Sequence, residues 1–158
     1  MKSLELDVFH AYGADWALVS AGSLEDYNTM TVSWGGLGTL WGKIVATVYI
    51  RPNRHTYGYL ENNEFFTVSF YPEEYRADLK TLGTLSGKDC DKVAQTGLTA
   101  VAAGESVTFA QAKRTLLCRK LFAQDLDPNA IPQQVMDTFY AKEPVHRMYI
   151  GEVVEILE

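Results

Sequence analysis

The sequence is poor in cysteine, has no excess of positive charge and contains no long hydrophobic run, and each absence excludes a class of protein. Its two cysteines, Cys90 and Cys118, are too few and too far apart for a disulfide framework, so both are expected to be reduced thiols. The 14 basic residues against 20 acidic ones give a formal net charge of −6, which argues against nucleic acid or an anionic membrane as the main partner. No apolar run approaches the roughly 18–20 residues that span a bilayer. Because two acids lie near the N-terminus, where a signal peptide has its apolar core, we expect a cytoplasmic protein.

Several motifs of enzyme catalysis are also missing. There is no G-x-S-x-G sequence, and neither cysteine has a histidine close by in the chain. The three histidines (His10, His55 and His146) form no H-x-x-x-H pair, so no metal site is expected. The glycines of residues 35–38 do not replace a dinucleotide-binding G-x-G-x-x-G, because no helix is expected after them. A chain without an evident acid–base pair is typical of a protein whose chemistry is done by a bound cofactor.

What the sequence does contain predicts one mainly β domain over residues 1–158, with 47% hydrophobic residues to form a core. Hydrophobic patterning predicts strands at residues 16–22, 29–34, 44–50, 65–70, 115–124 and 148–157. Helices are predicted at residues 54–62, at 73–82 and from Ile131-Pro132 to about residue 140, with a short helical piece near 91–94. Residues 35–42 hold so many glycines that we expect a loop. Strands joined mostly by turns, with inserted helices, favour an antiparallel barrel over a doubly wound fold.

Two of the predicted strands differ in their patterning. In residues 29–34, Met30, Val32 and Trp34 alternate with hydroxyl-bearing side chains, which predicts one face toward the core and one toward something polar. Residues 44–50 form a continuous β-branched and aromatic run, which predicts a buried strand.

The first candidate site is a phosphate-binding cluster. Arg51 and Arg54 flank a proline at the end of a strand, and Thr56 falls just inside the following helix, where free N–H groups and the helix dipole favour an anion. The hydroxyl and amide side chains of residues 28–33 would add donors. A solvated turn between strand and helix is the alternative interpretation.

Other candidates are weaker. The sequence Ser86-Gly87-Lys88-Asp89, with Lys92 close behind, is a second possible anion contact or an ordinary surface turn. Trp34, Trp41 and Tyr71 are core or interface aromatics, or one of them covers a flat ring ligand. His146 could donate to a ligand, although a lone histidine at a strand start is more often a surface residue.

Four motifs in this order resemble the flavin reductase-like family of FMN-binding split-barrel proteins, which includes flavoredoxins and ferric reductases. They are Asn-Thr-Met-Thr-Val-Ser-Trp-Gly at 28–35, Ile-Arg-Pro-x-Arg-x-Thr at 50–56, Ser-Gly-Lys-Asp-x-Asp-Lys at 86–92 and His-x-x-Tyr-Ile-Gly-Glu-Val at 146–153. The resemblance extends over about residues 17–155. It implies a Greek-key split β-barrel that forms a homodimer, with FMN near the subunit interface.

The resemblance also implies the roles of individual residues. The isoalloxazine and ribityl chain would be lined by the first motif and the loop after Trp34, and the phosphate would be held by the second motif. The third motif would lie near the flavin and would reach across the dimer interface. The cofactor-binding residues carried over in this way are Asn28, Thr29, Met30, Thr31, Val32, Ser33, Trp34, Ile50, Arg51, Arg54, Thr56, Ser86, Gly87, Lys88, Asp89 and Lys92. His146 matches a histidine near the nicotinamide site of many members, but Glu-Pro-Val precedes it here instead of Gly-Asp, so no catalytic residue is assigned.

The implied activity is hydride transfer from NADH or NADPH to flavin N5, followed by delivery of electrons to a small-molecule or protein acceptor. This step needs no protein acid or base. One alternative is a flavin-binding electron carrier or flavin store without an NAD(P)H site of its own. Another is a related split barrel that binds haem or pyridoxal phosphate, since paired arginines do not distinguish one phosphate ester from another.

Overall fold

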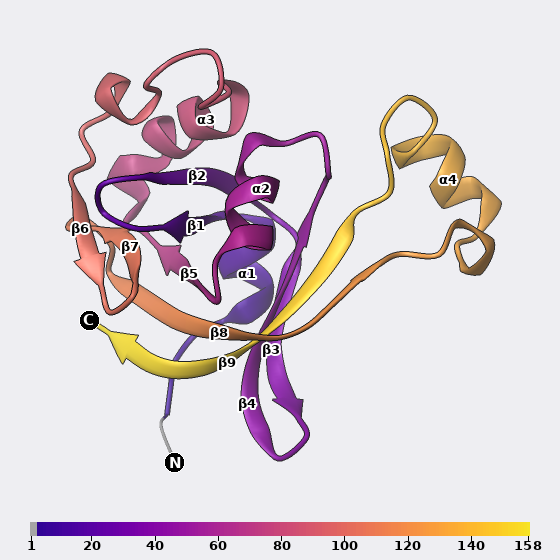
Figure 1. Cartoon of the computed structure of the whole chain (residues 1–158), viewed down its shortest axis with the longest axis horizontal. Helices are drawn as coiled ribbons and strands as arrows, with labels where there is room; N and C mark the ends of the chain where they lie inside the picture. Colours follow the sequence, from indigo (N-terminus) through magenta and orange to yellow (C-terminus); the bar gives the residue numbers. More distant parts are fainter. Residues whose placement is uncertain (1–2) are drawn as a thin grey trace.

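A computed structural model describes residues 3–158 and is dominated by one antiparallel sheet of seven strands in the order β2-β1-β5-β8-β9-β4-β3 (Figure 1). Three neighbouring pairs, β1 with β5, β5 with β8 and β4 with β9, join strands that are far apart in the chain, as in a Greek key. The sheet ends at β2 and β3, so the barrel is split between these two strands. The strands are β1 (Ala17–Gly22), β2 (Tyr27–Val32), β3 (Gly35–Leu40), β4 (Lys43–Ile50), β5 (Phe65–Phe70), β8 (Arg114–Asp125) and β9 (Arg147–Leu157), with a separate hairpin of β6 (Ala100–Ala103) and β7 (Ser106–Phe109). The expected mainly β split barrel is confirmed.

The helices are short and lie around the barrel. They are α1 (Val8–Gly13), α2 (His55–Asn62), α3 (Arg76–Thr84) and α4 (Gln133–Phe139), with 3₁₀ turns η1 (Glu73–Tyr75), η2 (Val93–Gln95) and η3 (Pro128–Ala130). Both α2 and α3 pack on β2. These two helices therefore bring the chain segments at their ends toward the same strand.

Helix α4 is arranged differently. It lies in the connection between β8 and β9, well away from the barrel (Figure 1), and none of its residues is buried. We call residues 126–146, which carry this helix, the arm. No helix within residues 3–158 is long and apolar enough to cross a membrane.

Most expected elements are confirmed to within a few residues, but the loop expected at 35–42 is wrong. Residues 35–40 form β3, which pairs with β4 through a two-residue turn in which Trp41 and Gly42 both have positive φ, as in a type I′ hairpin. A Cβ on Gly35 would lie 2.7 Å from a ring carbon of Tyr12 and 2.8 Å from the Thr47 carbonyl oxygen. Gly35 thus lets the Tyr12 ring lie directly on the strand, which is one of the reasons for glycine inside a strand. Helix α1, which carries Tyr12, was not anticipated, and neither was the β6–β7 hairpin.

The expectation of a continuously buried strand at residues 44–50 is also wrong. Val48 and Ile50 are fully buried in the core, whereas Thr47 and Tyr49 are half-buried. From Ala46 to Ile50 the strand therefore alternates, and Tyr49 on its second face lines a cleft.

Candidate functional site

A cleft of about 190 Å³ lies where the barrel is split, between the end of β2 and the start of β9. We call it the arginine cleft, and its lining residues are Met30, Thr31, Val32, Ser33, Trp34, Tyr49, Arg51, Arg54 and His146. The strand register explains part of this grouping, because β4 pairs Ile50 with Arg147, so that Arg51 and His146 follow as the next residues outward. Residues from the first, second and fourth sequence motifs therefore meet here.

A larger cleft of about 460 Å³, the lysine cleft, opens beside it between the β1–β2 turn and the segment before η2. It is lined by Glu25, Asp26, Tyr27, Asn28, Gly87, Lys88, Asp89, Cys90, Asp91, Lys92 and Val93. The Asn28 amide donates to the Thr56 hydroxyl at 2.7 Å, which ties β2 to the start of α2. A Cβ on Gly87 would lie 2.1 Å from the Asn28 side-chain oxygen, so only glycine fits there. Residues of the first three motifs are thus in contact.

Arg51 connects the arginine cleft to the arm. Its Nη1 donates to the carbonyl oxygens of Phe139 at 3.3 Å and Pro144 at 3.0 Å. Its guanidinium also lies 5.2 Å from the ring centre of Tyr140, a cation–π distance. These hydrogen bonds use Nη1 only, so the other nitrogens of the guanidinium are left for a ligand.

Arg54 immediately precedes α2 and is half-buried, and its Nη2 donates to the Gly83 carbonyl at 3.3 Å. Burial and the neighbouring Arg51 charge both lower the pKa of Arg54 from its usual value. The two guanidinium groups therefore create a local positive potential in an otherwise acidic protein. Such a potential attracts an anion.

Lys92 adds a third positive group. It is only 2% exposed, and its Nζ donates to the carbonyls of Leu82 at 3.0 Å and Leu85 at 3.2 Å, at the end of α3. A cation is favourable at a helix C-terminus, so this contact has a structural role. Burial, followed by repulsion from Arg54, nevertheless lowers the pKa of Lys92 to about 8. The repulsion would be relieved by an anion bound nearby.

The hydroxyl face of β2 is occupied mainly by the protein itself. Thr29 is fully buried, and its hydroxyl is bonded to Ser20 at 2.8 Å and to the Val19 carbonyl at 3.2 Å. Thr31 donates to the Leu79 carbonyl of α3. Met30 and Val32 lie in the core as expected, but the strand ends at Val32 and Trp34 is 44% exposed, so the expected place of Trp34 on the core face is wrong. The polar face meets β1 at Thr29 and α3 at Thr31.

Three further residues that were expected to bind the cofactor line neither cleft. Ile50 is fully buried in the core. Thr56 is only 1% exposed, and its hydroxyl accepts the hydrogen bond from Asn28. Ser86 accepts a hydrogen bond from the Lys88 amide at 3.2 Å and so shapes a turn.

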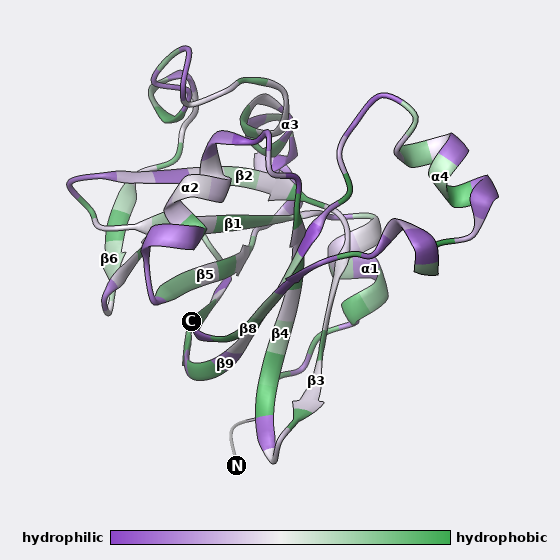
Figure 2. Cartoon of the chain, turned by 45° about the vertical axis from the view of Figure 1, so that its right-hand side comes forward, coloured by the Kyte–Doolittle hydropathy of each residue, from purple (hydrophilic) through white to green (hydrophobic). Residues whose placement is uncertain are grey.

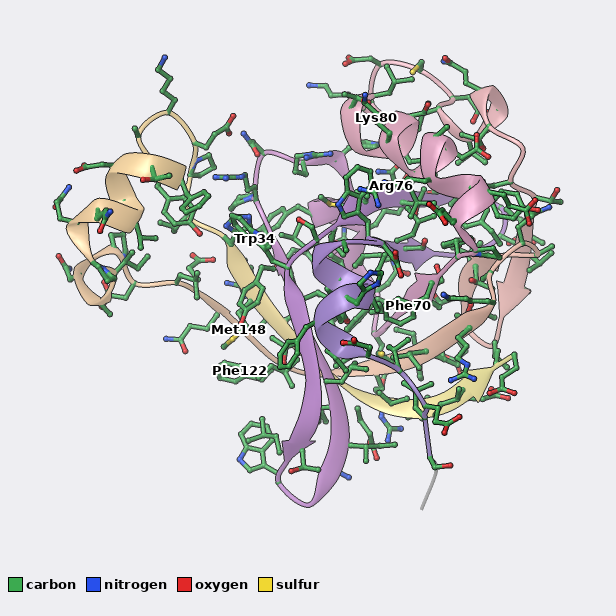
Figure 3. The ribbon with its side chains drawn as sticks, turned by 180° about the vertical axis from the view of Figure 1, so that it is seen from behind. Trp34, Phe70, Arg76, Lys80, Phe122 and Met148 are labelled. Carbon is green, nitrogen blue, oxygen red and sulfur yellow. The ribbon has the colours of Figure 1, made fainter. Side chains whose placement is uncertain are left out.

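His146 is 7% exposed, and its Nδ1 lies 2.6 Å from the Tyr140 hydroxyl. Its ring centre is 5.2 Å from that of Trp34, which in turn makes an edge contact with Phe139 at 5.1 Å. Burial and the Arg51 charge lower the pKa of His146 to about 4, so the imidazole is neutral near pH 7. Figure 3 places Trp34 between the barrel and the arm.

Sequence reasoning missed two residues of this site. Tyr49 could have been found, because it alternates with the more apolar Val48 and Ile50. No pattern in the sequence around Tyr140 indicates that it belongs to the site. Its contacts with Arg51 and His146 form only when the arm folds back onto the end of β4.

No protein-family model and no curated protein matches this sequence, but solved structures match it throughout. An FMN-binding protein from Thermus thermophilus, with bound 1-cyclohex-2-enone, is 21% identical with a TM-score of 0.72 over 100% of this chain and 80% of that one. Flavoredoxin from Methanosarcina acetivorans is 16% identical with a TM-score of 0.73 over 100% of this chain and 75% of that one. An NADH:FAD oxidoreductase from Streptomyces globisporus, in complex with NAD and FAD fragments, is 13% identical with a TM-score of 0.68 over 91% and 74%. The chain therefore has the fold of the FMN-binding split-barrel proteins that its motifs resemble.

The lowered pKa of Lys92 predicts a specific dependence of stability on pH. Between pH 8 and 10.5 the unfolded chain keeps a proton on this lysine that the folded chain has lost, so the free energy of unfolding should rise with pH across this window. We expect a rise of about 1–3 kcal/mol for the wild type relative to Lys92→Met, measured by urea denaturation at several pH values. Lys88→Met, at an exposed lysine of the same segment, is the control and should follow the wild type. Identical pH profiles for the wild type and Lys92→Met would contradict the assignment.

Proposed function

We propose that this protein is an FMN-binding oxidoreductase that takes a hydride from NADH or NADPH and passes electrons on to a small-molecule or protein acceptor. The observation that carries the proposal is the arginine cleft, in which Arg51 and Arg54 lie beside Trp34 at the split of a barrel whose fold is shared with FMN-binding proteins. Bound FMN would supply the hydride and electron chemistry, and the protein would supply binding and orientation.

The charges of the site fit the phosphate of FMN. Arg54 lies at the start of α2, where backbone N–H groups have no partner within the helix. Burial and repulsion from Arg51 lower the pKa of Arg54, against the opposing charge of Glu143, and burial and repulsion from Arg54 lower the pKa of Lys92. A bound anion would relieve both repulsions. We assign the phosphate to Arg54 and the start of α2, with Arg51 and Lys92 as neighbouring charges.

The other parts of the site suit a flat ring. Trp34 and Met30 offer an aromatic and an apolar surface in the same cleft. The Asn28 amide, held by Thr56 and Gly87, lines the lysine cleft close by. A ring bound over these residues would be shielded from water by Trp34 on one side.

The size of the arginine cleft supports a second candidate function. At about 190 Å³ it is smaller than the roughly 300–1,000 Å³ typical of ligand pockets. A site this small favours one ring over two stacked rings, as in an electron carrier that is reduced by a partner. Flavoredoxin is among the proteins with this fold.

We further propose that a second copy of the chain completes the site. Trp34, Val135 and Phe139 are 44%, 37% and 42% exposed and lie at the cleft and on the arm beside it. Figure 2 shows hydrophobic segments in α4, although this helix stands away from the barrel. A seven-residue helix without buried residues is marginal in water. A homodimer that covers this face would bury it and place FMN near the interface.

The net charge and the cysteines of the chain bear on its partners and its compartment. The net charge of −6 disfavours nucleic acid and anionic membranes as partners. Two free thiols fit a reducing compartment, and we propose the cytoplasm.

The activity is tested by loading the protein with FMN and mixing it with NADH or NADPH in the absence of oxygen. Rapid loss of the oxidised flavin absorbance, well above that of free FMN, is expected for the oxidoreductase. A protein that holds FMN tightly and reacts with neither nucleotide would be the carrier. Failure to bind FMN at all would overturn both functions.

Replacing Arg51 and Arg54 together by alanine should weaken FMN binding by about 3 kcal/mol, roughly 100-fold, because a charge-assisted hydrogen bond from Arg54 and the neighbouring charge of Arg51 are lost. Riboflavin, which lacks the phosphate, should lose much less affinity than FMN in the double variant. Fluorescence titration with both ligands measures this. Arg119→Ala, at an exposed ion pair with Glu152, is the control for removal of an arginine. Equal losses for FMN and riboflavin would remove the phosphate assignment.

Replacing both Val135 and Phe139 by lysine should convert the dimer to a monomer and weaken FMN binding, because charges are placed on the face that a second copy would cover. Gln134→Lys, on the same exposed helix, should leave the dimer intact. Sedimentation equilibrium gives the oligomeric state. A wild-type protein that is monomeric at all concentrations would contradict the proposed homodimer.

A further inference from the structure

The side chain of Tyr140, in the arm, touches two residues of the arginine cleft. Its hydroxyl lies 2.6 Å from Nδ1 of His146, and its ring lies under the Arg51 guanidinium at 5.2 Å. Arg51 also holds the backbone on both sides of Tyr140, through the carbonyls of Phe139 and Pro144. The ring is therefore fixed from two directions.

The direction of the Tyr140–His146 hydrogen bond decides which nitrogen of His146 carries the proton. If Nδ1–H donated to the phenol oxygen, the phenol hydrogen would need another acceptor, and no other hydrogen bond to this hydroxyl occurs within residues 3–158. If the phenol donates to the Nδ1 lone pair, the phenol hydrogen and the Nδ1 lone pair are both satisfied, and only the Nε2–H is left for another partner. The positive Arg51 beside the ring also makes the phenol a better donor and a poorer acceptor. Both considerations favour donation by Tyr140.

We propose that Tyr140 is a positioning residue that holds His146 in the neutral form protonated at Nε2, so that the arginine cleft presents a neutral N–H donor beside two fixed positive charges. The matching ligand group is an uncharged acceptor on a flat ring, such as a carbonyl oxygen of the flavin or the carboxamide oxygen of a nicotinamide. This choice of acceptor rests on the proposed function, whereas the assignment of the proton does not.

A neutral donor suits this place for a physical reason. In the proposed site Arg51 and Arg54 already provide positive charge for the phosphate of FMN. A third positive charge in the cleft would be repelled by both. The neutral imidazole also lies against the Trp34 ring, 5.2 Å from its centre, in a region largely closed to water. Its Nε2 has no hydrogen-bond partner within the described part of the chain and is left to meet a ligand.

The proton position is measured first, without flavin. Long-range ¹H–¹⁵N NMR of the labelled protein near pH 7 distinguishes the two neutral forms of each histidine from the charged form. The chain has three histidines, so His146→Gln assigns the signal. We expect the Nε2-protonated form in the wild type and a shift toward the other neutral form in Tyr140→Phe, which keeps the ring under Arg51. Tyr75→Phe, remote from the cleft, should match the wild type.

The NMR spectra of the wild type and of Tyr140→Phe can each overturn the proposal. Protonation at Nδ1 or a charged imidazole in the wild type would overturn the proposal, and so would an unchanged His146 signal in Tyr140→Phe. Unchanged signals of His10 and His55 establish that the variant is folded. If the variant did not fold, the wild-type spectrum alone would still decide where the proton lies.

The ligand group is identified with the FMN-loaded protein. An uncharged hydrogen bond is equivalent to about a tenfold effect. If the acceptor is the nicotinamide, Tyr140→Phe should slow flavin reduction by NAD(P)H about tenfold and leave FMN affinity unchanged. If the acceptor is the flavin, FMN affinity should fall by a similar factor. No change in either quantity would overturn the assignment of the acceptor. A wild type inert to NAD(P)H would refute the oxidoreductase activity but not the NMR result.

Discussion

The antiparallel pairing of β8 with β9 is the interaction on which the rest of the structure depends. Of the strands in residues 3–158, β8 pairs with β5 on one side and β9 pairs with β4 on the other. The two halves of the sheet are therefore joined through this pair alone. Its register shifts between Leu117 and Cys118 and between Lys120 and Phe122, and such bulges bend a strand and increase its twist. At the bend a Cβ on Gly151 would lie 2.7 Å from the Phe66 ring, so glycine there permits close packing. The location of the candidate site follows from this closure, because the sheet ends at β2 and β3 and the chain between them borders the arginine cleft.

Arg51 has two roles that do not compete. It holds the arm through two backbone carbonyls, and it still brings charge to the cleft that the arm borders. Arginine can do this because its planar guanidinium presents several donors in fixed directions, whereas lysine offers a single charged centre. Lys92 also has two roles, since it caps α3 while burial, followed by repulsion from Arg54, lowers its pKa. The positive charge of the site is thus maintained by contacts that stabilise the fold, and an anionic ligand would compensate it.

The candidate site was partly predictable from the sequence. Arg54 and Thr56 were correctly expected at the start of a helix, and Arg51, His146 and the residues around Trp34 do meet in one cleft. The hydroxyl groups of Thr29 and Thr31 were expected to face a ligand. Alternation assigns side chains to a face but does not say what covers that face, and here α3 and the neighbouring strand β1 supply the partners. Tyr140 was missed because the arm that brings it to the site is packed by contacts far apart in the chain.

Local patterning by itself determined most of the fold. The alternation of residues 29–32, the apolar runs of β5 and β9 and the helix signals after Pro52 and Pro72 gave these elements nearly their observed bounds, because each depends on interactions within a few residues. Helix α1 and the β6–β7 hairpin were missed, and residues 35–40 were wrongly expected to be a loop, since glycines that signal a loop form a strand under the Tyr12 ring. Three features were decided only by the tertiary structure. They are the strand at residues 35–40, the pairing of β4 with β9 and the contact of the arm with Arg51. Each of these depends on contacts between distant segments, and the energy of such contacts is not encoded in any short stretch of sequence.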